Sequence, residues 1–353
     1  MTYKNASKNK PVGVIGTGSF GTAVANLLAE NHPVILYSRR SEKVEEINRT
    51  KMSGGQVLHN RITATNDKDL LCDSCKLIFP SVPSKHFRSM LRDFASRLLP
   101  DHILIHTTKG LDVVDKDNSD DEKIGTITTA SDVLTMSQVI MQETNVKRIG
   151  CMSGPNLARE LALKQPAATV IASKFDEVIE AGRFAIRSPR FQVYCSHNII
   201  GIELAGVLKN SLALAAGALN GMNLGQNALA FLISRGIREM IQLGEALGAD
   251  KSAFLGLAGI GDIIATCTSP LSRNFNVGYR IAQGETLEYI LSTSSEVAEG
   301  LRTVNICNML GKQLGLDIPI IFTTYRVLFE DMDLNEGLSF LMNYKNTFDV
   351  DFI

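Results

Sequence analysis

The chain has 353 residues, of which 44% are hydrophobic and 21% are charged, and its formal net charge is -1. The apolar content excludes a mainly disordered protein, and the balanced charge argues against a protein that coats nucleic acid or binds membranes through a polybasic surface. A single hydrophobic core rarely extends over so many residues, so we expect two domains.

Strand and helix patterns alternate along the first half of the chain. The apolar run 12–15 predicts a strand, 19–30 predicts a helix, and 34–37 predicts a second strand. Further short apolar runs predict strands at 76–79, 103–105, 149–151, 168–172 and 191–194. Repeated strand–helix–strand units of this length predict an α/β domain with a mostly parallel sheet and helices on both faces.

Strand patterns stop near residue 197. Long Ala- and Leu-rich stretches follow, and they predict helices at 199–219, 228–247, 301–314 and 320–329. We therefore expect an all-α second domain over 198–353, after a first domain over 1–197. The apolar stretch 199–233 is interrupted by polar residues, so we expect buried helices there and no membrane span.

The start of the chain and the apolar helices bear on location and assembly. Residues 1–10 are polar and basic without an apolar core, so we expect no signal peptide and a cytoplasmic protein. The apolar helices of the second half suit a homodimer as well as the core of a domain.

Cysteine and histidine spacing argues against a metal site. Cys72 and Cys75 form a lone C-x-x-C pair, and a strand pattern follows it where a redox-active pair needs a helix. We therefore expect ordinary, semi-buried thiols. The six histidines show no ligand spacing. The acidic segment 112–131 lacks the Gly and Glu of a calcium loop, so we expect a solvated surface loop and no bound metal.

The motif G-x-G-x-x-G at 16–21 lies between a predicted strand and a predicted helix. Gly16 permits a tight turn, Gly18 allows the backbone to approach a pyrophosphate, and Gly21 allows the helix to pack closely on the strand. The amino end of the helix then presents N–H groups to the phosphates. In this context the motif predicts a Rossmann-like domain that binds a dinucleotide.

The residues after the second predicted strand bear on the choice of cofactor. NAD-specific sites usually have Asp or Glu there, whereas this chain has Ser38-Arg39-Arg40. Two guanidinium groups suit the 2′-phosphate of NADP(H). The alternative is an ordinary basic start of the next helix, so NADP(H) is favoured and NAD(H) stays open.

Two lysines lie where ligands or apolar contacts are expected. Lys109 follows the predicted strand 103–105, at the end where parallel sheets bind ligands. Lys209 lies in the apolar helix 199–219, where either its tip reaches solvent or it meets an anion. Because burial lowers the pKa of a lysine, a buried one could exchange a proton with a substrate oxygen.

The second half also contains polar residues suited to a small anion. A glycine-rich loop over 256–261 ends at Asp262, and Thr266 follows one helical turn later. Ser272-Arg273-Asn274 comes next and offers a positive charge with several hydrogen-bond donors. Such a combination favours the binding of a phosphate.

Together these motifs resemble the family of bacterial-type NAD(P)-dependent glycerol-3-phosphate dehydrogenases over nearly the whole chain. The resemblance rests on GTGSFGTA at 16–23, SVPS at 81–84, TKG at 108–110, SGPNLARE at 153–160, GIELAGVLKN at 201–210, and the segments 227–239, 256–267, 272–274 and 299–300. It implies a helical second domain like that of 6-phosphogluconate dehydrogenase. It also implies reduction of dihydroxyacetone phosphate to sn-glycerol 3-phosphate, which supplies the backbone of glycerophospholipids.

The resemblance implies roles for individual residues. Lys209 would exchange the proton, and Lys109 and Asp262 would assist it. The cofactor site would include the three glycines of the motif. Its residues would be Gly16, Gly18, Ser19, Phe20, Gly21, Arg39, Arg40, Lys109, Ala158, Arg273, Val297 and Glu299. Substrate contacts would come from Lys109, Gly154, Asn156, Lys209, Asp262, Thr266, Ser272, Arg273 and Asn274.

One departure and two rival functions accompany this interpretation. The family usually has Ser at the position of Asn156; both side chains donate hydrogen bonds, so we expect the contact to remain with a changed geometry. Another two-domain hydroxy-acid dehydrogenase would leave the run 272–274 without a role. A nucleotide-sensing protein without turnover would have no need of Lys109, Lys209 and Asp262 together.

Overall fold

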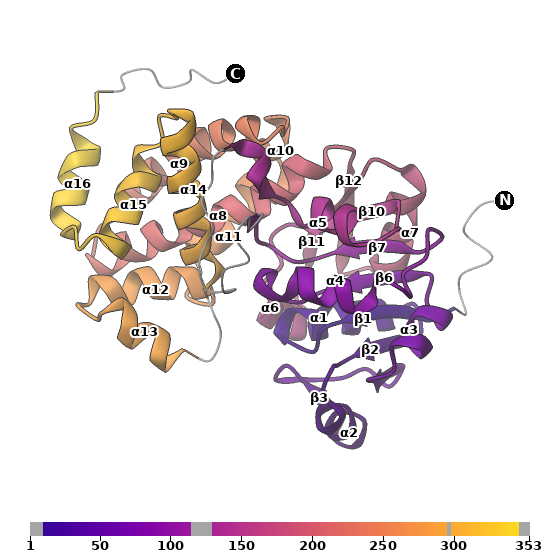
Figure 1. Ribbon diagram of the computed structural model, residues 1–353. Coiled ribbons are helices and arrows are strands. Elements are labelled where there is room, and N and C mark those ends of the chain that lie inside the picture. Colours follow the sequence, from indigo (N-terminus) through magenta and orange to yellow (C-terminus); the bar gives the residue numbers. More distant parts are fainter. Residues whose placement is uncertain (1–9, 114–128, 295–297, 346–353) are drawn as a thin grey trace. The chain divides into compact units, whose positions relative to one another are not determined.

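The computed structural model describes residues 10–113, 129–294 and 298–345 (Figure 1). The chain forms two compact units. Unit 1 comprises Met1–Asp112 and Thr135–Glu203, and unit 2 comprises Val113–Leu134 and Leu204–Ile353. A single domain boundary at residue 197 stays a prediction, and most of the acidic segment 112–131 lies outside the described residues.

Unit 1 is built on an eight-stranded sheet with the order β12-β11-β10-β7-β6-β1-β2-β5. Its strands are β1 (Val12–Ile15), β2 (Val34–Tyr37), β5 (Ile62–Thr65), β6 (Leu77–Pro80), β7 (Ile103–His106), β10 (Arg148–Ser153), β11 (Ala167–Ser173) and β12 (Phe191–Ser196). Neighbouring strands pair in parallel, except for the antiparallel pair β10 and β11. The central strands are short and fully buried because both sheet faces are covered by helices.

Helices and one small hairpin complete unit 1. The helices are α1 (Ser19–Ala29), α2 (Ser41–Thr50), α3 (Lys68–Ser74), α4 (Phe87–Phe94), α5 (Met136–Glu143), α6 (Ala158–Ala162) and α7 (Asp176–Ile186). Helix α1 packs with α6 and α7, whereas α4 packs with α5. The hairpin consists of the short strands β3 (Met52–Ser53) and β4 (Gln56–Val57), which pair with each other. The short strands β8 (Asp112–Val113) and β9 (Val133–Leu134) also pair, and all of their residues except Asp112 belong to unit 2.

Unit 2 is helical. It contains α8 (Ile199–Gly221, which begins in unit 1), α9 (Gln226–Ala246), α10 (Ser252–Leu255), a π-helical turn (Leu257–Gly261), α11 (Asp262–Cys267), α12 (Arg273–Ala282), α13 (Leu287–Thr293), α14 (Glu299–Leu314), α15 (Pro319–Phe329) and α16 (Leu334–Met342). Helix α8 is long and apolar enough to cross a membrane, but 89% of its most apolar window is buried inside the protein. It is therefore a core helix.

The predicted elements are present with shifted ends. Strands β7, β10 and β12 extend beyond the apolar runs that predict them, to His106, Ser153 and Ser196. The strand β5 was not predicted, because its sequence ITAT is short and half polar. It forms on the open edge of β2, where Ile62 and Ala64 are buried. The expected α/β fold followed by a helical part is confirmed.

Candidate functional site

Several predicted site residues of unit 1 lie at one edge of the sheet. The strands β1, β2, β6, β7 and β10 run parallel, so their carboxyl ends meet at the same edge. The strand order β5-β2-β1-β6-β7-β10 proceeds outwards in both directions from the pair β1 and β6. Ligands of open parallel sheets bind where the order reverses in this way, and the glycine motif follows β1 at this point.

The glycine motif has the geometry that a dinucleotide phosphate needs. Gly16 has a φ of +122°, and a Cβ atom there would lie 2.5 Å from the carbonyl oxygen of Ser81. A Cβ on Gly21 would overlap the carbonyl of Gly16. By contrast, among the described residues other than Gly18 and its two chain neighbours, no heavy atom lies within 4 Å of a Cβ placed on Gly18, so this face of the loop is open to a ligand. Gly18 is the N-cap of α1, whose amino end favours negative charge. The residues present therefore fit a pyrophosphate.

A hairpin that the sequence analysis did not assign contacts this loop. Gln56 Nε2 donates a hydrogen bond to the carbonyl oxygen of Ser19 (2.7 Å), and Ser53 Oγ donates to that of Thr17 (3.2 Å). Both side chains belong to the hairpin of β3 and β4. The Gly54-Gly55 pair between two short polar stretches was the available signal for a turn, but it does not say what the turn contacts.

The two arginines that favour NADP(H) follow β2. The backbone N–H of Ser38 donates to the carbonyl of Thr65 (2.9 Å), which continues the pairing of β2 with β5 by one residue. Arg39 and Arg40 come next, and both are exposed. Arg40 is the N-cap residue of α2, so the two guanidinium groups belong to the point where the sheet ends and the helix begins.

The segment after β7 is tied to its neighbours by side-chain hydrogen bonds. Thr107 Oγ1 donates to Ser81 Oγ (2.8 Å), and Thr108 Oγ1 donates to the carbonyl of Val82 (2.7 Å). Lys109 Nζ donates to the carbonyl of Gly154 (3.2 Å), so the structure brings together two of the predicted substrate residues. Lys109 is partly buried.

Asn156 is held by a buried hydrogen-bond chain. Its Nδ2 donates to Thr169 Oγ1 (2.9 Å), which in turn donates to the carbonyl of Ser153 (3.1 Å). Its Oδ1 is buried and has no hydrogen-bond partner among the described residues. The Asn156 amide therefore offers an acceptor as well as a donor. The sequence analysis, which compared Asn156 with the Ser usual in the family, considered only the donor. Ala158 begins the next helix, α6.

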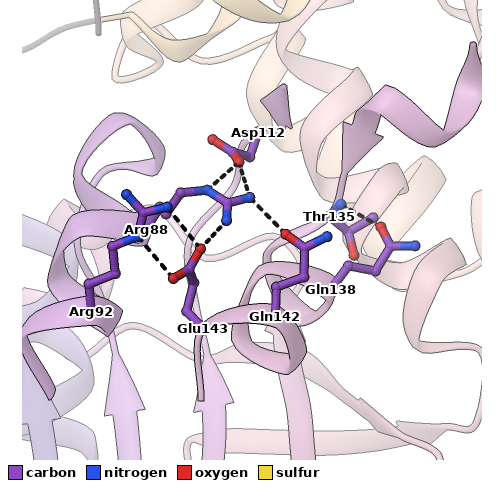
Figure 2. A network of polar contacts seen from close by, with 7 residues as sticks. All are labelled: Arg88, Arg92, Asp112, Thr135, Gln138, Gln142 and Glu143. Atoms are coloured by element: carbon purple, nitrogen blue, oxygen red, sulfur yellow. Dashed lines mark hydrogen bonds and ion pairs between the residues drawn. The ribbon is translucent and has the colours of Figure 1, made fainter. Parts of the chain in front are cut away.

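A network of charged side chains fixes the chain just beyond Lys109 (Figure 2). Arg88 Nε and Nη2 both donate to Asp112 Oδ2 (2.8 and 2.6 Å), and Arg88 Nη1 donates to Glu143. Arg92 also donates to Glu143 (2.9 Å). Burial opposes ionisation of Glu143, but the hydrogen bonds from Arg92 and Arg88 lower its pKa overall. Glu143 is therefore ionised at neutral pH, and the network anchors the segment that follows Lys109.

The predicted catalytic residues of unit 2 form one buried cluster. The Lys209 ammonium donates to the Asp262 carboxylate and to Thr266 Oγ1 (2.6 Å), and Thr266 Oγ1 donates to the backbone carbonyl of Asp262 (2.6 Å). The exposed fractions of the three residues are 5%, 1% and 4%. Lys209 lies in the middle of α8, whereas Asp262 and Thr266 lie one turn apart on α11. A buried lysine with these two partners has a fixed position and a charge partner.

The remaining predicted residues of unit 2 lie at two helix starts. Ser272 is the N-cap of α12 and accepts a hydrogen bond from the backbone of Phe275, while Arg273 is the first, exposed residue of this helix. Asn274 Oδ1 accepts from the backbone N–H of Gly300 (3.0 Å), next to Glu299 at the start of α14. Val297 lies outside the described residues.

The cysteine pair has the properties of buried structural thiols. Cys72 lies in the last turns of α3 and Cys75 follows the helix, whereas redox-active pairs lie at a helix amino end. Burial raises the pKa of Cys72 to about 11 and that of Cys75 to about 12, so both thiols are protonated and unreactive at neutral pH.

Within 10–113, 129–294 and 298–345, no three His, Cys, Asp or Glu side chains lie together as a set that could hold a metal ion.

Comparisons with known proteins show the family of the chain. Residues 11–179 match the model of the NAD-dependent glycerol-3-phosphate dehydrogenase N-terminus, and residues 198–339 match that of the C-terminus. The chain is 37% identical to glycerol-3-phosphate dehydrogenase [NAD(P)+] of Pseudomonas fluorescens (98% of this chain, 94% of the relative) and 38% identical to that of Azotobacter vinelandii (98% and 97%). The crystal structure of glycerol-3-phosphate dehydrogenase from Coxiella burnetii superposes with a TM-score of 0.84 at 28% identity, over 95% of this chain and 99% of that one. The chain belongs to the family of NAD-dependent glycerol-3-phosphate dehydrogenases.

Proposed function

We propose that the protein reduces dihydroxyacetone phosphate to sn-glycerol 3-phosphate, reversibly, with NADPH as the favoured reductant, and so supplies glycerophospholipid synthesis. The reaction type is supported by the family and by full-length relatives at 37–38% identity. The observation that carries the chemistry is the buried cluster of Lys209, Asp262 and Thr266. Bound reduced nicotinamide supplies the hydride.

Lys209 is the proposed proton donor to the C2 oxygen. A cationic ammonium beside a carbonyl oxygen stabilises the negative charge that develops there during reduction, and it can then transfer its proton. Asp262 balances the charge of the buried ammonium, and Thr266 Oγ1 fixes its direction. In glycerol phosphate oxidation the same lysine accepts the proton.

The substrate phosphate is the proposed ligand of Arg273, with Asn274 and Lys109 as further donors. Arg273 is exposed at the amino end of α12, where the helix dipole adds to its positive charge. Phosphate binding far from the carbonyl supplies binding energy that orients the reacting carbon. The buried Oδ1 of Asn156, which has no hydrogen-bond partner among the residues that the structure describes, is the proposed acceptor for a substrate hydroxyl.

The cofactor phosphates are the proposed ligands of the glycine loop. The open space beside Gly18 and the amino end of α1 support this role. Arg39 and Arg40 support recognition of the 2′-phosphate, because they stand where an acidic residue would otherwise bind the ribose. We include a cytoplasmic location and a homodimer in the proposal; the exposed Phe340 and Met342 on α16 support the dimer.

The test is a spectrophotometric assay of the purified protein with dihydroxyacetone phosphate and either NADPH or NADH. We expect reduced cofactor to be consumed and sn-glycerol 3-phosphate to form. Lys209→Met, which retains the length of the side chain without its charge, should lower kcat by about 10²- to 10⁴-fold. Its affinity for NADPH, measured by fluorescence titration, should stay within a factor of about two if the variant is folded.

Two results would contradict the proposal. Absence of consumption with both cofactors would refute the reaction itself. Turnover by a folded Lys209→Met variant at close to the wild-type rate would refute the role of the lysine.

A further inference from the structure

The hairpin of β3 and β4 lies outside the eight-stranded sheet but contacts the glycine loop on both sides of Gly18. Ser53 Oγ donates to the carbonyl of Thr17, and Gln56 Nε2 donates to the carbonyl of Ser19. Ser53 and Gln56 are cross-strand partners in the hairpin. Their exposed fractions are 2% and 9%, so water does not compete freely for these bonds.

Further contacts hold the hairpin on helix α1. Thr22 Oγ1 donates to Ser53 Oγ (3.1 Å), which leaves the Ser53 hydroxyl hydrogen for Thr17. One turn further along α1, Asn26 Nδ2 donates to the carbonyl of Val57 (3.0 Å), and Asn26 Oδ1 accepts from the backbone N–H of His59 (2.8 Å). The hairpin is therefore bonded to the loop and to the first turns of the helix that follows it.

The turn of the hairpin packs directly against the loop. Gly54 has a φ of +51°, and a Cβ atom there would lie 2.9 Å from both the carbonyl oxygen of Gly18 and the Cα of Ser19. This approach requires glycine. The contact is between backbones, so it fixes the position of the loop and not only that of its side chains.

The planarity of the peptide bond makes these contacts relevant to phosphate binding. In a trans peptide the C=O and the following N–H point in opposite directions within one rigid plane. Fixing the carbonyl of Thr17 therefore fixes the N–H of Gly18, and fixing the carbonyl of Ser19 fixes the N–H of Phe20. These N–H groups belong to the amino end of α1, which favours phosphate oxygens.

We propose that Ser53 and Gln56 are positioning residues for the cofactor, and that the hairpin holds the glycine loop in the conformation that binds pyrophosphate before the cofactor arrives. This inference rests on the proposed function, because it assigns the same loop to a dinucleotide. Preorganisation lowers the entropy lost on binding, so the hairpin acts on cofactor affinity and not on the chemical step.

The experiment compares full-length Gln56→Met, Ser53→Ala and the double variant with the wild type. Gln56→Met retains the shape of the side chain and loses its donor. Because each single variant loses one hydrogen bond to the loop, it should weaken NADPH binding by about two- to tenfold in a fluorescence titration. The values of kcat at saturating NADPH, and of KM for dihydroxyacetone phosphate, should stay within about twofold of wild type.

Val57→Ala is the matched control. Val57 lies on the same hairpin next to Gln56, but its side chain is 72% exposed, so NADPH affinity should not change. Amide hydrogen exchange without cofactor gives a second measurement. Exchange of the Gly18–Thr22 amides should be faster in Gln56→Met and in Ser53→Ala than in the wild type, and unchanged in Val57→Ala.

The outcomes separate this inference from the proposed function. If the wild type binds no NADPH or reduces no substrate, the proposed function fails. If the wild type does both, and Gln56→Met and Ser53→Ala bind NADPH within a factor of about two of it, the positioning role is refuted. A fall in thermal stability without a change in NADPH affinity would likewise refute it, because it would mean that the hairpin only stabilises the fold. Should the double variant not fold, the single variants decide.

Discussion

The ammonium of Lys209 is held by a carboxylate and a hydroxyl, and all three groups are almost completely buried. A buried cation is stable only with such partners, because the loss of hydration must be offset by paired charge and hydrogen bonds. The same arrangement gives a proton donor a fixed direction. At Lys209 the same two partners therefore stabilise the buried charge and orient the proton donor.

Asp262→Asn tests how far the lysine depends on its partner charge. The amide retains a hydrogen-bond acceptor but removes the negative charge that balances the ammonium. We expect kcat to fall by about 10- to 100-fold, with NADPH affinity unchanged. Thr266→Val, which removes a neutral partner, should have a smaller effect measured in the same steady-state assay. Equal effects of the two variants would argue against a special role for the charge.

Arg39 and Arg40 allow a test of cofactor preference. The double variant Arg39→Ala/Arg40→Ala should lower kcat/KM for NADPH by about 10- to 100-fold, because it loses charge-assisted hydrogen bonds to the 2′-phosphate. With NADH the change should be less than about threefold. The control is Arg49→Ala, which removes a positive charge from the exposed last turn of α2, the helix that follows Arg40. It should leave the cofactor preference unchanged. Equal losses with both cofactors would rule out 2′-phosphate recognition.

Residue type and spacing singled out residues of the candidate site, but they did not indicate every contact between distant residues. Lys209 was singled out by its charge in an apolar helix, and Asp262 by its place at the end of a glycine-rich loop. The pairing of His106 with Glu203, whose Nε2 and Oε1 atoms lie 2.8 Å apart, joins residues far apart in the chain. No local pattern marks such a pair, because the fold alone brings β7 and the start of α8 together.

At the scale of elements, the start of helix α15 is bound by a side chain from another helix. Glu239 on α9 accepts hydrogen bonds from the backbone N–H groups of Ile320 (2.7 Å) and Ile321 (3.0 Å). Pro319, the first residue of α15, has no N–H to satisfy. Burial raises the pKa of Glu239 from its usual value near 4.5 to about 8, although the two backbone hydrogen bonds oppose this shift.

The raised pKa of Glu239 predicts how stability depends on pH. In the unfolded chain the carboxyl ionises above pH about 4.5, whereas in the folded protein it stays protonated until about pH 8. Its contribution to stability is therefore fully present below about pH 4.5 and is lost as the pH rises through about 8, by on the order of a few kcal/mol. Glu239→Gln does not titrate, so its free energy of unfolding should fall less between about pH 5 and 8.

Urea unfolding at several pH values measures this difference. Glu245→Gln, on an exposed position of the same helix, is the control and should follow the wild type. Parallel curves for the wild type and Glu239→Gln would contradict the prediction.

Elements with a strong apolar run were predicted from the sequence, whereas those that depend on a neighbour were not. The runs VGVI and VILY become β1 and β2. The hairpin of β3 and β4 has only two residues in each strand, and its position is set by the turn at Gly54-Gly55 and by hydrogen bonds to α1. Its contact with the glycine loop could not be predicted, because it depends on tertiary packing.

For the whole molecule, the order of strand and helix patterns predicted an α/β part followed by a helical part. The two compact units do not follow that order throughout. Residues 113–134 are grouped with unit 2, although in the sequence they lie between strands of unit 1. Local sequence does not reveal this grouping.

The interruption of unit 1 has a consequence for synthesis of the protein on the ribosome. Strand β7 is complete at His106, but its neighbour β10 begins only at Arg148, after residues 113–134. The growing chain therefore carries β1, β2, β5, β6 and β7 before the strand that covers the edge of β7 has been made. An open strand edge can pair with other chains. During translation of this interval the edge of β7 lacks the strand that covers it in the folded protein, and this exposure of β7 ends when β10 emerges.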